Sequence, residues 1–462
     1  MSIPAAIFLI AVGIALLALP RIWAPLALLV GTCYFTLLQG INIGPFSFPA
    51  LRLLVLFGVA RILIRNERPL TGLISTDKLV LVWAAWFAVS SFFHSDPRGT
   101  LIFHLGLIYN TLGIYFLLRC ICIGPEHSIN LVRLMALVLA PVAAEMVLEH
   151  VLNFNLFSAF GGVDATPIVR QGRIRAQGPF SHPILAGTVG GVCFPLMISI
   201  VKVHRVPAMI GALSCLAMVV TSASSGPIMS TFFGAVAIGF WVFRRHLTGF
   251  RIAAVVVYLI LEVVMNSPPY YLMARIDFTG SSTGYHRAAL MESAGKHLDE
   301  WWFAGTDYTR HWMPYGVPWS EDHADITNHY LGQGVKGGLP LMLLFIGLLV
   351  SSFRNVGATM RFAEATGRFP AFLPWCIGAS LFSHAATCIS VAYFDQSIVF
   401  LNGAMALTAC LRAGAEYESM TETDSLAISD LPESSTSAIP ETGGSELDPF
   451  GDRPISRAND VC

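Results

Sequence analysis

Charged side chains are scarce in this chain of 462 residues: Asp, Glu, Lys and Arg together make up 12% of it. Soluble domains usually carry about 25%. Hydrophobic residues make up 55%, and the mean hydropathy is +0.64. A soluble chain of this length could not bury so much apolar surface in its core. The shortage of charge therefore excludes an ordinary soluble protein and indicates that apolar residues face lipid.

Other familiar features are absent as well. None of the nine cysteines falls in the longest polar segment, residues 267–328, so no disulfide framework is expected there. The sequence has no internal repeat, no glycine-rich phosphate loop and no cysteine or histidine pattern typical of a metal site. We therefore predict no cofactor, no metal and no nucleic-acid partner, and an ATP-driven function would need a second protein.

Thirteen apolar segments are candidates for membrane-spanning helices, and they predict an all-α polytopic membrane protein. They run at about residues 3–19, 22–38, 49–64, 78–94, 100–123, 128–150, 181–203, 206–223, 226–243, 252–266, 330–352, 371–390 and 396–411. The first three are short and interrupted by proline, so the predicted number is 12 or 13. No basic region precedes the first segment, which we interpret as a retained helix rather than a signal peptide.

Lysine and arginine in short loops predict the orientation. Four basic loops fall on one side, which is then cytoplasmic: Arg61 to Lys78, Lys202 to Arg205, Arg244 to Arg251 and Arg354 to Arg368. The loops at 95–99, 151–180, 221–225, 267–328 and 391–396 then face outward. The loop at 151–180 opposes the rule, because it carries Arg170, Arg173 and Arg175 against Asp164. Basic residues on the outer side suggest a role other than topology.

The charge distribution divides the chain into two predicted parts. Residues 413–462 contain eleven acidic residues and two arginines, and removing these from the total of 29 acidic and 28 basic residues leaves 18 and 26. Residues 1–412 are predicted to form the transmembrane domain, with the large outer loop at 267–328 containing short helices. The rest is predicted to be a disordered, acidic, cytoplasmic tail.

The outer segments combine arginine, histidine and carboxylates, a mixture that suits an anionic lipid-linked substrate. Arginine binds phosphate oxygens through two parallel hydrogen bonds and keeps its charge. A neutral histidine can accept a proton from an attacking hydroxyl group, and arginines can stabilise a diphosphate as it leaves. Four tryptophans also lie in the large loop: Trp301, Trp302, Trp312 and Trp319. They fit an interfacial aromatic belt or a platform for sugar stacking.

Several short motifs resemble those of the O-antigen ligase and polymerase superfamily of bacterial envelope glycan assembly. The stretch Arg175-Ala-Gln-Gly-Pro-Phe-Ser-His-Pro183 looks like the family's Arg-x-x-Gly-x-Phe-x-His-Pro element. Gly284-Tyr-His-Arg287 is similar to the arginine-bearing stretch of its large outer loop. Asn328-His-Tyr-Leu331, followed by glycines, resembles its His-Asn-x-x-Leu element. The order of these motifs matches from about residue 50 to residue 411.

The chain departs from the family's pattern in three places. Histidine follows Asn328 instead of preceding it, which places it two residues further along the chain. The family's Ser-Arg-Gly element is Ser224-Ser-Gly226 here, without arginine. Trp302-Phe-Ala-Gly305 stands where the family has a Pro-x-x-Gly turn. These changes bear on the roles of individual residues.

The resemblance implies a metal-independent membrane glycosyltransferase that needs no cofactor. Its donor would be a glycan on undecaprenyl diphosphate, and a hydroxyl of a glycan or lipid acceptor would attack the anomeric carbon on the outer face of the bacterial inner membrane. Other envelope polysaccharide assembly proteins would be its partners. Ligases and polymerases share these elements, so the sequence does not distinguish them.

The same resemblance implies roles for seven residues. Arg175 and Arg287 would clamp the diphosphate, and His329 would be the base or would orient the acceptor. The further substrate-binding candidates are Arg173, Arg310, His323 and His182. Among these, His323 is the substitute for His329 as the base, and His182 is expected mainly to organise the start of a helix.

Two other functions remain open. A transporter or flippase for lipid-linked glycans would place ionisable groups near the middle of the bilayer. The few candidates for such groups are Arg52, His104, Arg133, Glu145, Glu262, Lys336 and His384. A metal-dependent glycosyltransferase could bind a cation through the acidic stretch from Glu321 to Asp325. The concentration of charge in the outer loops favours chemistry at the membrane surface over transport. No pair of residues in the acidic stretch has a spacing that is diagnostic of a metal site.

Overall fold

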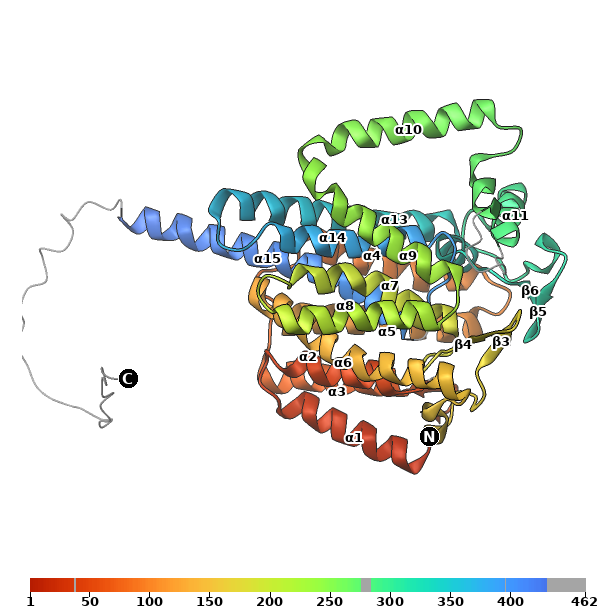
Figure 1. Cartoon of the computed structure of the whole chain (residues 1–462), viewed down its shortest axis with the longest axis horizontal. Coiled ribbons are helices and arrows are strands. Elements are labelled where there is room, and N and C mark those ends of the chain that lie inside the picture. The colour runs from red at the N-terminus through yellow and green to blue at the C-terminus, as the bar shows by residue number, and fades with distance from the viewer. Residues whose placement is uncertain (37–38, 276–283, 395, 430–462) are drawn as a thin grey trace, which may run out of the picture. The chain divides into compact units, whose positions relative to one another are not determined.

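The computed structural model describes residues 1–36, 39–275, 284–394 and 396–429, and Met1–Tyr417 form one compact unit (Figure 1). Most of these residues are helical, which confirms the predicted helical class. The thirteen helices that correspond to the predicted apolar segments are α1 (Ile3–Ala18), α2 (Ala24–Tyr34), α3 (Ala50–Arg65), α4 (Ser75–Ser90), α5 (Pro97–Ile121), α6 (Gly124–Leu152), α7 (Pro183–Ser199), α8 (Arg205–Thr221), α9 (Ser225–Gly239), α10 (Leu247–Val264), α13 (His329–Thr366), α14 (Phe372–Thr387) and α15 (Ser397–Ser429).

Six stretches of the described chain are long and apolar enough to cross a membrane, judged by length and composition. They are Ser75–Phe93, Pro97–Ile121, Gly124–Leu152, Ser225–Val264, His329–Thr366 and Ser397–Thr421. Several of the remaining apolar helices are shorter than a full span. Figure 1 shows α10 apart from the other helices, and none of its residues is buried. A multi-pass membrane protein is therefore supported, while twelve or thirteen crossings stays a prediction.

The segment between α10 and α13 is compact, and we call residues 267–328 the large loop. It contains the predicted short helices, namely α11 (Gly284–Lys296) and α12 (Leu298–Trp301), and the 3₁₀ turns η4 (Pro269–Arg275) and η5 (Arg310–Trp312). Asp277, one of its charged residues, lies outside the described residues.

Three short antiparallel hairpins were not predicted. They pair β1 (Gly40–Ile43) with β2 (Phe46–Pro49), β3 (Ile168–Arg170) with β4 (Arg173–Arg175), and β5 (Gly316–Val317) with β6 (Ser320–Ala324). In the β3–β4 hairpin the two turn residues, Gln171 and Gly172, have φ values of 50° and 73°. Two positive φ values in a two-residue turn match the twist of paired strands, which explains the hairpin.

Two of the buried arginines in the helical unit, Arg61 and Arg119, are each neutralised by a carboxylate. The Arg61 guanidinium binds both oxygens of Glu67, at 2.6 and 2.8 Å. Arg119 binds both oxygens of Asp77 on α4, at 2.9 and 3.0 Å. A buried charge without such a partner is costly, so these two ion pairs stabilise the unit.

A break in α13 anchors the large loop. Gly337 and Gly338 leave helical geometry, and Gly338 has φ 76° and ψ −179°. The turn that follows α12 fits into the break: the N–H of Thr306 donates to the Val335 carbonyl, and the N–H of Leu339 donates to the Trp302 carbonyl, both at 2.8 Å. A Cβ atom on Gly338 would collide with the carbonyl of Phe303. The glycines therefore let the loop backbone hydrogen-bond with the helix.

The helix α15 runs through to Ser429, so residues 413–429, predicted as part of the disordered tail, are helical. Arg412 and Glu416 form an i,i+4 ion pair at 2.7 Å, which favours the helix at this point. The rest of the predicted tail, residues 430–462, lies outside the described residues.

The break in α13 can be tested with one methyl group. We expect Gly338→Ala to lower the stability by about 2 kcal/mol or more, because alanine disfavours a positive φ and its Cβ meets a backbone carbonyl. Gly332→Ala is the matched control, since it lies in the same helix with no atom within 4 Å of the added Cβ. Thermal unfolding in detergent measures both. Equal melting temperatures for the two variants would contradict this account.

Candidate functional site

The two polar segments singled out from the sequence lie at the same end of the helical unit. Figure 1 shows the β3–β4 hairpin, α11 and the β5–β6 hairpin together at this end, although more than a hundred residues separate the first from the others. The segment 168–187 and the large loop are therefore neighbours in space. Their charged residues are the candidate functional site.

Arg175 is held at the end of β4 by the turn between α8 and α9. Its side chain is 5% exposed, its Nη2 donates to Ser224 Oγ at 2.6 Å, and its Nε donates to the Ser222 carbonyl at 3.4 Å. No partner for Nη1 is found among the described residues. The Ser224-Ser-Gly226 element, which lacks the family's arginine, thus supplies the hydroxyl that orients Arg175.

A carboxylate on α6 fixes the next turn of this segment. Glu149 Oε2 accepts the N–H groups of Gln177 and Gly178, at 3.0 and 2.7 Å, and Asn155 donates to the Gly178 carbonyl at 2.8 Å. Gly178 has φ 57°, which glycine adopts without strain. The sequence analysis missed Glu149, although a carboxylate in an apolar helix is itself a signal.

His182 caps the N-terminus of α7, as the sequence analysis expected. Its Nδ1 accepts the N–H of Ile184 at 3.1 Å. Burial, and then the positive charges of Arg175 and Arg170, lower the pKa of His182 from 6.5 to about 4. The ring is therefore neutral at pH 7, which keeps the accepting lone pair that the cap requires.

Arg287 lies in the first turn of α11 and is half-buried. Its Nε is buried and has no hydrogen-bond partner among the described residues. Burial lowers the pKa of the Arg287 guanidinium, whereas the nearby Asp325 raises it. This arginine differs from Arg61 and Arg119, whose guanidinium groups are fully paired.

Arg170 connects the two segments electrostatically. Its charge acts on Arg175 and His182 in its own segment and also on Arg287 in the large loop. Three arginines from two distant parts of the sequence therefore create one positive region. The sequence analysis counted Arg170 only as a loop charge, because nothing in the sequence shows which loop faces it.

His329 is the first residue of α13 and is 5% exposed. Its Nδ1 accepts the backbone N–H of Tyr393 at 3.1 Å, and its Nε2 lies 3.3 Å from Nε2 of Gln333. The ring also packs against Phe345. Both ring nitrogens thus contact groups of the helical unit, which leaves no free lone pair in this arrangement.

The other predicted residues lie in the two hairpins and near η5. Arg173 is exposed opposite Arg170 in the β3–β4 hairpin. Arg310 donates to the carbonyls of Met313 and Pro314, at 2.8 and 3.2 Å, so it braces its own loop. His323 is exposed on β6, with Nδ1 2.7 Å from Ser320 Oγ. Its Nε2 has no partner among the described residues.

A histidine–aspartate contact joins the large loop to the end of α4. His94 Nδ1 lies 2.6 Å from Asp307 Oδ1, and the N–H and hydroxyl of Ser95 donate to Asp307 Oδ2, both at 2.7 Å. Partial burial disfavours the charged carboxylate, but these hydrogen bonds outweigh it and lower the pKa of Asp307. The contact fixes the turn between α12 and η5, and the sequence analysis missed it.

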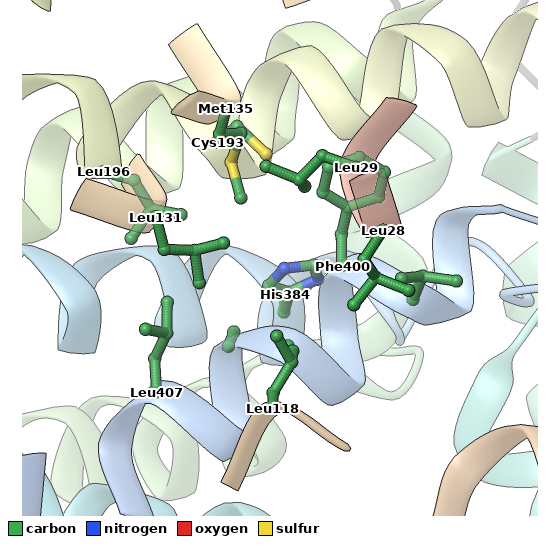
Figure 2. Close-up of a pocket in the computed structure, with 13 residues that line it drawn as sticks. Leu28, Leu29, Leu118, Leu131, Met135, Cys193, Leu196, His384, Phe400 and Leu407 are labelled. Carbon is green, nitrogen blue, oxygen red and sulfur yellow. The ribbon is translucent and has the colours of Figure 1, made fainter. Parts of the chain in front are cut away.

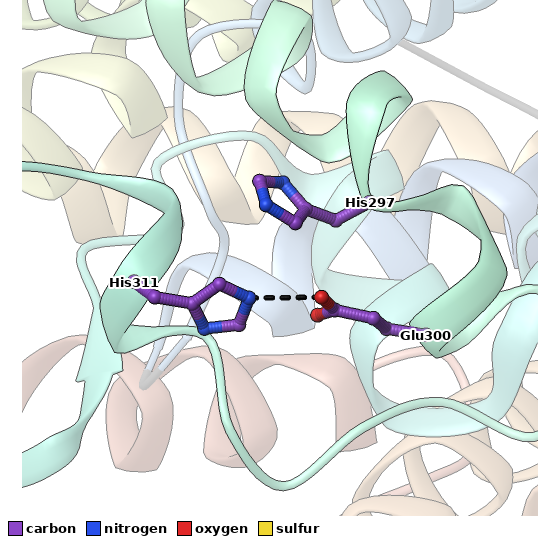
Figure 3. Close-up of side chains that lie close together, drawn as sticks. All are labelled: His297, Glu300 and His311. Atoms are coloured by element: carbon purple, nitrogen blue, oxygen red, sulfur yellow. Dashed lines mark hydrogen bonds and ion pairs between the residues drawn. The ribbon is translucent and has the colours of Figure 1, made fainter.

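Within the described part of the chain, the acidic stretch from Glu321 to Asp325 does not form a group that could hold a metal ion. The group that could do so is His297, Glu300 and His311 in the large loop (Figure 3). None of these three was predicted as a ligand, because each belongs to a different turn.

A cavity between the helices is not a substrate site. Figure 2 shows His384 among apolar side chains that include Leu28, Leu118 and Leu131. The volume of the cavity is about 30 Å³. Pockets for small ligands start at about 300 Å³, so no sugar fits this cavity.

Comparison with protein-family models, curated proteins and solved structures finds no match to this chain. The argument for function therefore rests on the site itself.

The cap formed by His182 predicts a pH dependence of stability. Because its pKa is lower in the folded protein, its contribution is complete above pH 6.5 and is lost as the pH falls toward 4. We expect a loss on the order of 2 kcal/mol in this window, and a smaller loss in His182→Asn, because asparagine caps without titrating. Unfolding in detergent at several pH values measures it.

His204→Asn is the matched control, since His204 precedes α8 without a capping hydrogen bond from its side chain. It should follow the acid profile of the unaltered protein. An unchanged acid profile in His182→Asn would show that the cap does not titrate in this range.

Proposed function

We propose that the protein is a membrane glycosyltransferase of the O-antigen ligase and polymerase type. It would transfer a glycan from undecaprenyl diphosphate to a hydroxyl group of a glycan or lipid acceptor. The observation that carries the proposal is the positive region formed by Arg170, Arg175 and Arg287, in which Arg287 Nε is buried and has no partner among the residues that the structure describes.

The positive region suits a diphosphate. Like charges repel one another, so three arginines in one region are stabilised when an anion lies between them. The N-terminus of α11 adds its dipole, because Arg287 lies in the first turn of that helix. Arg175 Nη1 and Arg287 Nε have no hydrogen-bond partner within the described part of the chain, so these donors can bind phosphate oxygens. Arg173 and Arg310 contribute charge at longer range.

The reaction needs a proton acceptor and a stabilised leaving group. The acceptor oxygen forms a bond to the anomeric carbon, while the bond between that carbon and the phosphate oxygen breaks. The hydroxyl proton passes to a base, and the bonding electrons leave with undecaprenyl diphosphate. The arginines stabilise the negative charge that develops on the diphosphate, so the step requires no metal.

Among the histidines, His323 fits the role of the base better than His329. A base needs a free lone pair, and Nδ1 of His329 already accepts a hydrogen bond. His323 is exposed, and its Nε2 is free among the described residues. Asp325, which interacts with Arg287, is two residues further along, and alternate residues of an extended chain point to the same side.

The proposal includes a place for the site. The large loop and the segment 168–187 would face the periplasm from the bacterial inner membrane, where a lipid-linked donor presents its diphosphate at the interface. The exposed Trp302 and Trp319 would rest on that interface or stack against sugar rings.

If Arg287 binds the diphosphate, removing the positive charge of Arg287 should impair glycan transfer. We expect Arg287→Ala to reduce glycan transfer at least about a hundredfold, because the diphosphate loses a bidentate partner. Lys296→Ala removes the same charge from the other end of α11, where Lys296 pairs with Glu292, and should leave transfer unchanged. Glycan analysis of a deletion strain that carries each variant at equal membrane levels measures both. Equal transfer by the two variants would refute the clamp.

The two candidate bases can be separated in the same strain. We expect His323→Ala to lower turnover about a hundredfold or more with normal membrane levels, because the proton acceptor is lost. His329→Ala should act mainly on stability, because it removes hydrogen bonds inside the helical unit. The reverse pattern would return the role of base to His329.

A transporter of lipid-linked glycans is the second candidate, and the break in α13 favours it. Transporters use broken helices with ionisable groups at the break, and Lys336 directly precedes Gly337 and Gly338. Glycan analysis decides between the functions. Lipid-linked polymer that accumulates in the deletion strain indicates a ligase, and single repeat units indicate a polymerase. Flipping by the purified protein without formation of a glycosidic bond would refute the transferase.

A further inference from the structure

Three side chains of the large loop converge on one point at its surface. Figure 3 shows His297, which follows α11, above Glu300 from α12 and His311 from η5. One possible ligand atom from each residue lies within 4.8 Å of those from the other two. His311 Nε2 and Glu300 Oε1 are 2.9 Å apart. Two imidazoles and one carboxylate are a ligand set that zinc uses in proteins.

Each of the three side chains is oriented by a second group. His297 Nδ1 lies 2.8 Å from the carbonyl of Ser293, so this nitrogen carries the proton and Nε2 keeps its lone pair. The Trp312 indole N–H donates to Glu300 Oε2 at 3.0 Å, which leaves Oε1 turned toward His311. The Tyr308 ring stacks on His311, with the ring planes 12° apart. Outer hydrogen bonds of this kind orient metal ligands.

The carboxylate is ionised, as a metal ligand must be. Partial burial alone would favour the neutral acid. Hydrogen bonds from Trp312 and His311 outweigh this effect and lower the pKa of Glu300 below its usual value. The group therefore offers a carboxylate and two imidazoles to a cation.

We propose that His297, Glu300 and His311 bind one Zn²⁺ ion. Bonds of 2.0–2.1 Å from a tetrahedral ion hold its ligand atoms about 3.3 Å apart. The contact of 2.9 Å between Glu300 and His311 must lengthen by about 0.4 Å, and His297 must move closer by at most about 1.5 Å, so side-chain movements are enough to admit the ion. The site is exposed, and water takes the fourth position.

The position of the site indicates what the ion does. It links the C-terminal end of α11 and the short helix α12 to η5, across the turn that Asp307 attaches to His94. Ten residues of sequence separate His297 from Arg287, about 15 Å along a helix. The ion is therefore too distant to contact a diphosphate at Arg287, and it braces the helix that carries this arginine. This role does not depend on the proposed transfer reaction.

The test uses the full-length protein purified in detergent with a tag that contains no histidine. After treatment with chelator and dialysis against Zn²⁺, we expect one zinc per chain by elemental analysis. His297→Ala and Glu300→Gln should each bind Zn²⁺ at least about a hundredfold more weakly in competition with a chromophoric chelator. Glutamine can still accept the hydrogen bond from Trp312, so Glu300→Gln changes the charge with little change in packing. His286 is a half-buried histidine of the same loop outside this group, and His286→Ala should keep one zinc.

Two further measurements complete the test. Co²⁺ in place of zinc should give the visible absorption of a tetrahedral site with nitrogen and oxygen ligands, and His297→Ala should abolish it. Zn²⁺ should raise the melting temperature of the unaltered protein and of His286→Ala only. Melting temperatures in chelator verify that each variant is folded. Less than a tenth of an equivalent of zinc in the unaltered protein, or full binding by both His297→Ala and Glu300→Gln, would overturn the proposal.

Discussion

The contact between the large loop and the break in α13 is the interaction on which the rest of this end of the protein depends. A helix that is interrupted inside an apolar unit exposes backbone groups that no water can satisfy, and each such group is costly. Here the loop supplies the missing partners, since Leu339 donates to Trp302 and Thr306 donates to Val335. The loop and the helix therefore satisfy one another's backbone groups at the break.

This contact determines where the chemistry can take place. The turn at 301–306 lies between α12 and Asp307, and Asp307 is fixed a second time by His94 and Ser95. α11, which carries Arg287, precedes this anchored turn in the chain, and the β5–β6 hairpin, which Asp325 follows, comes after it. A site that recognises phosphate oxygens needs such rigidity, because bidentate hydrogen bonds depend on orientation.

The sequence predicted the positions of the helices well, because long apolar runs between polar flanks have few alternative structures in a membrane protein. The cap formed by His182 follows a short motif and is present in the structure, whereas the roles of Arg175 and Arg287 stay predictions. Contacts between distant segments were not predicted. Three such contacts join residues that are far apart in the sequence, and no local pattern predicts them. They are made by Glu149, by Arg170 and by the pair of His94 with Asp307. Residues 413–429 were predicted to be disordered because of their acidic composition. The ion pair of Arg412 with Glu416, which favours a helix there, was not considered.

The charged residues of this chain are few. Whether an arginine is paired with another protein group distinguishes a structural role from a binding role. Arg61 and Arg119 are buried and fully paired, and replacing either carboxylate would leave a charge that the interior cannot solvate. Arg310 also has a structural partner, because it donates a hydrogen bond to the carbonyl of Met313 in its own loop. Arg287 is half-buried, and its Nε has no partner among the residues of the described ranges. It belongs to a region that already contains Arg170 and Arg175. Protein stability gives no reason to gather three like charges there, whereas an anionic ligand does. The nitrogen without a described partner is therefore a stronger argument for the site than any single motif.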